Sequence, residues 1–168
     1  MKKLLFLTVV LGLFAVGSRA QSLDASIGYS YFRLGASDGI NQNGLSGSIA
    51  YNPNRFLGIV GDFGGYHGSP SGVSVTTYTY MFGPRISFRN PTNITPFVQG
   101  LIGGSHLSAG FSGASASTNP FAYSFGGGVD LGILPHLALR PQVDYVGLRD
   151  NGQTANCARI SIGVVLHL

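Results

Sequence analysis

Glutamate is absent from the chain, and its only lysines are Lys2 and Lys3. All other residues of the lysine and arginine pair are arginines, and every acidic residue is an aspartate. Soluble proteins rely on lysine and glutamate for much of their hydrated surface, whereas this chain is 44% hydrophobic and only 10% charged. These absences argue against an ordinary water-exposed exterior.

Two further absences limit the possible folds. The single cysteine, Cys157, has no partner for an internal disulfide, and we interpret it as an incidental residue. No apolar run of about 18 residues follows the first twenty residues, so that part of the sequence offers no transmembrane helix. The length that remains suits a single domain.

The first twenty residues have the organisation of a secretory signal peptide. Lys2 and Lys3 precede an apolar run that extends to Val16, and the small residues Ser18 and Ala20 stand at the two positions that a signal peptidase recognises. Because this run is too short to favour a membrane anchor, we expect residues 1–20 to be cleaved. The working domain is then 21–168.

Removal of this segment changes the charge balance. Lys2, Lys3 and Arg19 would leave with it, so the ten basic residues fall to seven against six acidic ones. No basic stripe is left to follow a phosphate backbone, and we expect no nucleic-acid partner.

Period-two alternation dominates the rest of the chain and predicts strands rather than helices. Eight strands are expected, at residues 24–34, 44–52, 55–66, 75–89, 95–107, 120–132, 136–148 and 157–168. Proline and asparagine mark tight turns at 52–54, 90–93 and 133–135. The other connections, at 35–43, 67–74, 108–119 and 149–156, are predicted to be long loops. Alternating short and long connections are typical of outer-membrane barrels, so the predicted fold is all-β: an eight-stranded antiparallel up-and-down transmembrane β-barrel.

The last predicted strand is the clearest amphipathic element. Large aliphatic side chains occupy every second position to the end of the chain: Ile160, Ile162, Val164, Leu166 and Leu168. Arg159, Ser161 and Gly163 lie between them and so point to the opposite face. Such a strand needs a partner along each edge, which barrel closure supplies. We expect those partners to be the strand at 136–148 and the first strand near residues 25–31.

The composition of the two faces predicts which one points outward. One face is built of Gly, Ser and Ala with isolated Asp and Arg, which suits the crowded lumen of an eight-stranded barrel and not a soluble exterior. Since buried charges need partners, the aspartates are expected to neutralise the arginines in a structural lumen network of Asp62, Arg85, Asp130, Arg140, Asp144 and Arg159. The other face matches a lipid-facing band with aromatic girdles. The girdle residues are Tyr31, Tyr78, Tyr80, Phe121, Tyr123 and Tyr145 toward the loop end, and Tyr51 and Phe88 toward the turn end.

Several segments resemble one known family. They are the strand from Tyr80 to Phe88 (YMFGPRISF), the turn at 90–93, the segment from Pro96 to Gly104 (PFVQGLIGG) and the alternating last strand. With these the chain is similar, over nearly all of residues 23–168, to the outer-membrane β-barrel domain family, the small eight-stranded barrels like the membrane domain of OmpA and OmpX. The chain departs from the family pattern at Leu168, where such barrels usually end in an aromatic residue that the assembly machinery reads. The tethering role of full-length OmpA is not carried over, because we expect no peptidoglycan-binding domain beside the barrel.

The histidines are the residues that invite a catalytic interpretation. Ser105 and His106 are adjacent, so on a strand they point to opposite faces and cannot form a nucleophile–base pair. His67 and His106 both lie near the loop end, where a neighbouring Ser would suggest a lipid-hydrolysing or acyl-transferring barrel. Serine is so common in this chain, however, that such a neighbour is expected by chance. His136 and His167 have no metal-ligand spacing around them. We expect no enzyme activity, no metal and no cofactor.

The function expected from the resemblance is that of a bacterial outer-membrane barrel with a structural or surface-interaction role. The implied partners are outer-membrane lipids, the barrel-assembly machinery and periplasmic chaperones, and an extracellular ligand at the loops, with the barrel itself a monomer. Three alternatives stay open: a narrow or gated small-solute channel, a lipid-modifying enzyme, and a secreted lipocalin-like binder with its apolar face inside.

Overall fold

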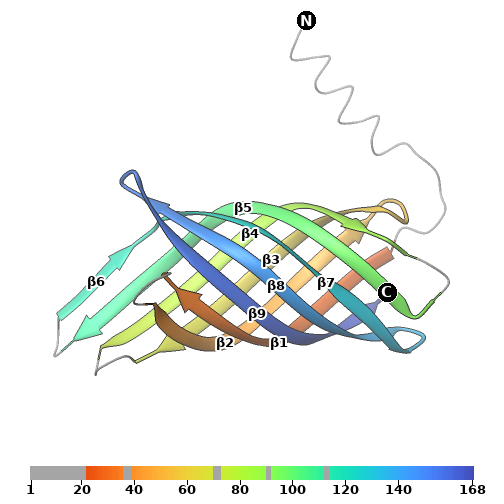
Figure 1. Cartoon of the computed structure of the whole chain (residues 1–168), viewed down its shortest axis with the longest axis horizontal. Coiled ribbons are helices and arrows are strands. Elements are labelled where there is room, and N and C mark those ends of the chain that lie inside the picture. Colours follow the sequence, from red (N-terminus) through yellow and green to blue (C-terminus); the bar gives the residue numbers. More distant parts are fainter. Residues whose placement is uncertain (1–21, 36–38, 70–72, 90–91, 112–113) are drawn as a thin grey trace, which may run out of the picture.

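The computed structural model describes residues 22–35, 39–69, 73–89, 92–111 and 114–168, with only the backbone described at 111, 114 and 115 (Figure 1). The predicted signal peptide, residues 1–20, lies outside these ranges. The strands are β1 (Ser22–Leu34), β2 (Ile40–Asn52), β3 (Leu57–Gly68), β4 (Ser74–Ser87), β5 (Ile94–Phe111), β6 (Ala114–Thr118), β7 (Phe121–Leu134), β8 (Leu137–Asp150) and β9 (Gln153–His167). No helix in the described ranges is long and apolar enough to cross a membrane.

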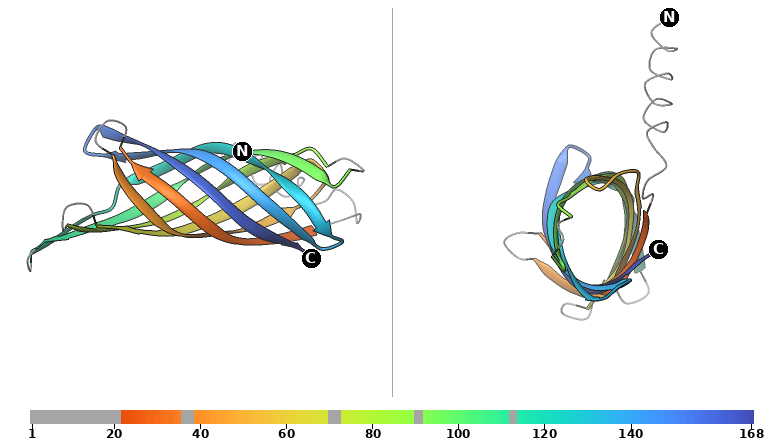
Figure 2. Two further views of the ribbon diagram at one scale, coloured as in Figure 1. Left: turned by 60° about the horizontal axis from the view of Figure 1, so that its bottom comes forward. Right: turned by 90° about the vertical axis from the view of Figure 1, so that its right-hand side faces the viewer.

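The strands form one closed antiparallel sheet. Each strand pairs with its neighbours in the order β4-β3-β2-β1-β9-β8-β7-β5-β6, and a further pairing of β4 with β5 closes the ring. The right-hand view of Figure 2 shows this ring end on. The last strand pairs with β1 and β8, which confirms both partners predicted for it.

The nine strands occupy eight positions around the barrel, because β6 and β7 together form one barrel strand that is interrupted by a proline. Both pair with the same edge of β5 in one continuous register, Leu107 opposite Thr118 in β6 and Gly104 opposite Phe121 in β7. Between these pairs the Ser105 N–H donates to the Pro120 carbonyl at 3.0 Å. Pro120 has no N–H of its own to continue the ladder. The predicted eight-stranded barrel is therefore confirmed.

Two of the four predicted long loops are wrong. The region 149–156 is a tight hairpin in which Asn151 and Gly152, with φ of 47° and 83°, connect β8 directly to β9. Asn-Gly is a typical sequence for such a turn, since both central residues need positive φ. In the region 108–119, β5 continues to residue 111 and β6 begins at residue 114. These long stretches extend the barrel strands as hairpins on the loop side (Figure 1).

The closing seam between β1 and β9 depends on two facing glycines. Gly28 stands opposite Gly163 in the ladder. A Cβ atom at Gly28 would lie 2.6 Å from the Cα of Gly163, closer than real Cβ contacts allow. Glycine at this pair lets the first and last strands approach closely enough to hydrogen-bond.

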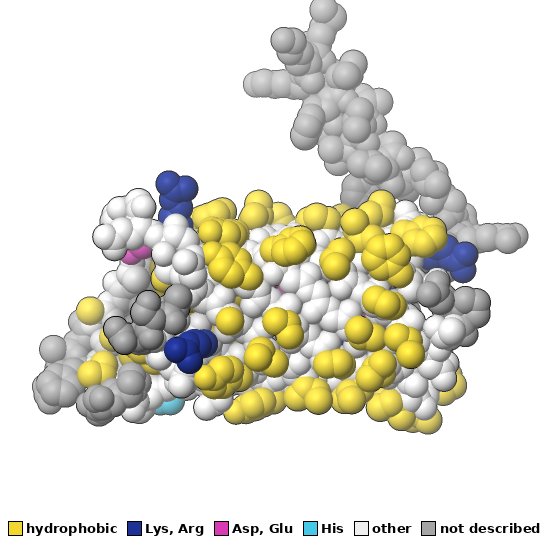
Figure 3. Space-filling model, in the orientation of Figure 1, with side chains coloured by type: hydrophobic (Ala, Val, Ile, Leu, Met, Phe, Trp, Pro, Cys, Tyr) yellow, Lys and Arg dark blue, Asp and Glu magenta, His cyan; other side chains and the backbone are white. Residues whose placement is uncertain are grey.

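The alternation places apolar side chains on the outside of the barrel. In β9 and just after it, the outward side chains are Ile160, Ile162, Val164, Leu166 and Leu168, each more than 40% exposed, whereas Arg159 and Val165 are buried inside. Figure 3 shows apolar side chains spread over the wall, with the visible basic side chains toward the two ends. An apolar surface this extensive is unfavourable in water, and a wall of this kind faces lipid.

Candidate functional site: the barrel lumen

The centre of the lumen is organised around Arg159. This side chain is 1% exposed and extends from β9 across the lumen to β3, where its Nη1 lies 2.6 Å from Asp62. Its Nη2 lies 2.9 Å from Asp144 on the neighbouring strand β8, and Nη1 also donates to the Tyr66 hydroxyl at 3.2 Å. Gln142 donates to both oxygens of Asp144. One buried guanidinium thus joins two carboxylates from different sides of the barrel.

A second ion pair lies toward the turn end. Arg140 on β8 makes a two-point contact with Asp130 on β7, at 2.5 and 2.7 Å. Its guanidinium carbon also lies 4.7 Å from the centre of the Phe97 ring, a cation–π distance. The bidentate geometry fixes both side chains.

Arg85 is held differently, and its predicted neutralisation by an aspartate is wrong. Its Nε and Nη2 donate to the side-chain oxygen of Gln99 at 3.1 and 2.8 Å, and its guanidinium carbon lies 4.5 Å from the centre of the Phe97 ring. Gln99 is its register partner on β5, and the position facing it on β3 is Gly58. Among the described residues, Arg85 forms no ion pair with an aspartate. The three predicted carboxylates are already engaged by Arg140 and Arg159.

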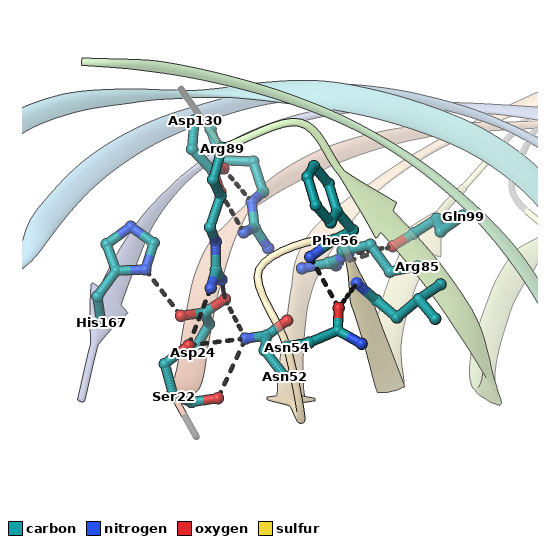
Figure 4. Close-up of polar contacts among 12 residues, drawn as sticks. Ser22, Asp24, Asn52, Asn54, Phe56, Arg85, Arg89, Gln99, Asp130 and His167 are labelled. Carbon is teal, nitrogen blue, oxygen red and sulfur yellow. Dashed lines mark hydrogen bonds and ion pairs between the residues drawn. The ribbon is translucent and has the colours of Figure 1, made fainter. Parts of the chain in front are cut away.

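A third charged cluster, not predicted from the sequence, lies at the turn-side mouth (Figure 4). Asp24 on β1 accepts from Arg89 at 2.8 Å and from the Asn52 amide at 2.7 Å. The ring of His167 on β9 lies 2.8 Å from the other carboxylate oxygen. This contact crosses the closing seam and ties the last strand to the first. The alternation of side chains predicts that both residues point into the lumen, because Asp24 shares a face with Ser26 and His167 shares one with Arg159.

Apolar side chains fill the lumen on the loop side. Phe32 and Tyr66 lie near the loop-side ends of β1 and β3, with their rings stacked at 4.6 Å between centres. Leu148 and Cys157 belong to the same buried cluster, together with Met81, Leu101, Ala122 and Val146. Its remaining members, Ala50 and Val60, lie in the turn-side halves of β2 and β3. Cys157 is thus a buried packing residue with a free thiol.

A cavity of about 20 Å³ lies beside Asp62, Arg140 and Gln142 and is otherwise lined mainly by serines and glycines. A volume of this size holds about one water molecule. A larger hollow of about 380 Å³ opens at the turn-side mouth, lined by residues that include Thr95, Asp130 and His167.

The predicted girdle residues are on the outer wall, with different exposures. Tyr78, Tyr80, Phe121 and Tyr145 are exposed in the loop-side halves of their strands, and Phe88 is exposed directly after β4 at the turn end. The other three, Tyr31, Tyr51 and Tyr123, are half-buried. Sequence reasoning missed Tyr29, whose exposed ring lies on the same face and whose hydroxyl donates to Asn43 at 2.8 Å.

The loop-side histidines stand apart from the lumen. His106 contacts the Asn119 side chain at 2.7 Å, and His67 contacts the hydroxyls of Thr76 at 3.1 Å and Ser69 at 3.3 Å. Over the described ranges, no three His, Cys, Asp or Glu side chains gather closely enough to hold a metal ion.

Comparison with known proteins identifies the fold. No protein-family model matches the chain, and no curated protein matches it in sequence. Its structure is similar to that of the neisserial surface protein A, NspA, with a TM-score of 0.74 at 14% identity over 88% of this chain and 99% of that one. It is also similar to Ail, the attachment invasion locus protein of Yersinia pestis, with a TM-score of 0.66 at 18% identity over 89% and 100% of the two chains. For the N-terminal β-barrel domain of Pseudomonas aeruginosa OprF, the TM-score is 0.58 at 17% identity over 86% and 97%.

At these identities the likeness shows the fold, which is that of the small eight-stranded outer-membrane barrels. The predicted resemblance to the membrane domain of OmpA and to OmpX is confirmed at this level. Because the outer wall is apolar and the lumen polar, the chain has the arrangement of a membrane barrel and not that of a lipocalin. Fold and wall together assign the protein to the bacterial outer membrane.

Proposed function

We propose that this barrel is closed to solutes and acts at the cell surface, where its loop-side hairpins bind an extended peptide segment of a partner protein. The observation that carries the proposal is the position of β6. Within the described residues, β6 pairs with β5 alone, at the end of the sheet order. Its other edge offers backbone N–H and C=O groups to an incoming strand.

The hairpins are long enough to hold this edge away from the membrane. β5 has 18 residues, whereas about 9–11 residues of a tilted strand cross a bilayer. The Thr118 hydroxyl donates to Asp150 and so connects the β5–β6 hairpin to the β8–β9 hairpin. Residues 107–118 contain no arginine or lysine. A strand-like partner suits this surface better than a polyanion, which needs clustered cations.

The filled lumen supports the closed state. Arg159 spans it between Asp62 and Asp144, and the apolar cluster of Phe32 and Tyr66 lies on the loop side. The names of two similar proteins agree with a role at the surface: NspA is named a surface protein, and Ail is named the attachment invasion locus protein and has been crystallised with a heparin analogue.

The test compares the full chain with a variant in which residues 108–117 are replaced by Asn-Gly. Both proteins should show heat-modifiable migration on gels, because the shortened segment lies above the lipid-spanning ladder. Bacteria that display the full chain should attach to a protein-coated surface, and bacteria with the shortened chain should not. Equal attachment by the two strains would overturn the proposed role of β6. Steady conductance of the full chain in planar bilayers would instead favour the small-solute channel.

We also propose that the barrel has no catalytic role. The Ser69 hydroxyl and the His67 ring are in contact, but the other ring nitrogen faces Thr76 and not the carboxylate that orients the base in a hydrolase triad. Lipid A from cells with the wild-type protein and from cells with Ser69→Ala should therefore give the same mass spectrum. Loss of a deacylated species in the variant would establish the enzyme alternative.

A further inference from the structure

A groove runs along the outer wall over β2, β3 and β4 and reaches β1 at Ile27. It consists of two adjoining hollows of about 460 and 420 Å³, which share Leu45, Gly65 and Tyr78 as lining residues. These three residues are register partners across the three strands. Both hollows are shallow and open along the outer wall. We refer to the two hollows together as the wall groove.

Glycines form the floor of the wall groove. Gly65 lies between Leu45 and Tyr78, and Gly47 lies opposite Phe63 in the next row toward the membrane centre. At these outward positions the absence of a side chain lowers the surface to the backbone. The neighbouring apolar side chains, including those of Leu45, Phe63 and Tyr78, are more than half exposed and form the sides.

The two ends of the wall groove differ in polarity. The row at the loop end is Asn43, His67 and Thr76, again register partners. Here the Tyr29 hydroxyl occupies the side-chain oxygen of Asn43, which leaves the Asn43 amide hydrogens available as donors. Among the residues that the structure describes, no arginine or lysine lines either hollow. The polar end therefore offers amide, imidazole and hydroxyl groups in place of the guanidinium groups that bind phosphate in two-point contacts, and these groups suit ester and hydroxyl oxygens.

We propose that the wall groove is a binding site for one acyl chain of a membrane lipid, with the ester group of that chain at the Asn43 row. The groove is continuous with the apolar wall that faces lipid, so acyl chains are the molecules that surround it. Its polarity runs in the matching direction, because the loop end lies at the membrane surface and the apolar floor lies deeper. This site does not depend on whether the lumen conducts or on what the hairpins bind.

Two matched variants test the site. Gly65→Leu fills the floor of the groove, where a Cβ atom meets the movable Tyr78 ring at 3.3 Å. Gly100→Leu adds the same side chain to β5, where a Cβ atom has no neighbour within 4 Å, and Gly100 lines neither hollow. The full-length barrel is refolded in detergent micelles doped with dipalmitoyl phosphatidylethanolamine and analysed by native mass spectrometry. Heat-modifiable migration verifies that each variant is folded.

The wild type and Gly100→Leu should each retain one lipid, and Gly65→Leu should retain at least about fivefold less. If Gly65→Leu does not fold, the ether-linked analogue of the same lipid provides the second measurement on the wild type. It lacks the ester carbonyl and should bind several-fold more weakly. The proposal is overturned if the wild type retains no lipid, if a folded Gly65→Leu keeps its lipid, or if both glycine variants lose it equally. Where Gly65→Leu does not fold, equal binding of the ether and ester lipids by the wild type overturns it.

Discussion

Arg159 and Arg85 are equally deep in the lumen but are held in opposite ways. Arg159 is 1% exposed and Arg85 is 2% exposed. Arg159 has two carboxylates within 2.9 Å, whereas Arg85 has only the neutral side chains of Gln99 and Phe97 as close partners among the described residues. Both guanidinium groups lose most of their hydration, and only for Arg159 do direct ion pairs offset the free-energy cost of that loss.

The difference shows that positive and negative charges balance over the whole lumen and not around each arginine. Around Arg159 there is one negative charge too many, and around Arg85 one positive charge too many. Gln99 connects the two regions, because its oxygen accepts from Arg85 while its amide donates to Asp144 at 3.4 Å. Over the described lumen, the arginines at 85, 89, 140 and 159 equal in number the aspartates at 24, 62, 130 and 144.

The largest effect is expected when the better-paired arginine is removed. Arg159→Met leaves Asp62 and Asp144 buried without a cation, and breaking a buried pair in this way costs about 3–5 kcal/mol. The free energy of unfolding can be measured by urea titration in lipid vesicles, with heat-modifiable migration as the readout. Arg149→Met, at an exposed position of β8, is the control and should change that free energy by less than about 0.5 kcal/mol. A cost below about 1 kcal/mol for Arg159→Met would show that the two aspartates are hydrated.

A smaller net effect is expected when a whole pair is replaced. Arg140→Met and Asp130→Leu should each cost about 3 kcal/mol, since each leaves one buried charge uncompensated. The double variant should be less destabilised than the sum of the two, with a coupling free energy of about 1–3 kcal/mol. The same urea titration on all four proteins gives this coupling. Strict additivity would mean that the 2.5 Å contact between Arg140 and Asp130 contributes nothing to stability.

The inside and outside of the barrel are predictable from the sequence because a strand has a period of two. The rows that begin at Arg159 and Ile160 point to opposite faces whatever the register. The partners across the lumen are not predictable in this way. Whether Arg159 on β9 meets Asp62 on β3 depends on the tilt and stagger of the closed barrel, which alternation does not encode. For the same reason the sequence did not reveal that Arg85 faces Gln99 and not an aspartate.

The connections are mispredicted for a different reason. The sequence contains a local signal in each of the two regions, but their polar composition favours long loops. Asn151-Gly152 is a turn sequence inside a region whose polar residues predict a long loop. Pro120 interrupts the barrel strand formed by β6 and β7, but a proline in the sequence does not by itself distinguish an interrupted strand from the end of a loop. The hairpin of β5 and β6, which forms the proposed surface site, could therefore not be predicted from the sequence.

The smallest effect is expected at the arginine that lacks a carboxylate. Arg85→Met keeps an apolar contact with the Phe97 ring and removes a buried cation that lies over the same ring as Arg140. Its main cost is the Gln99 oxygen that loses its donors, about 1–3 kcal/mol if no water replaces them. Relief from the unpaired charge offsets this cost, so we expect a net change in the unfolding free energy of about 1 kcal/mol or less. If Arg85→Met instead costs as much as Arg159→Met in the same titration, the balance of charge over the whole lumen governs stability more than the local ion pairs do.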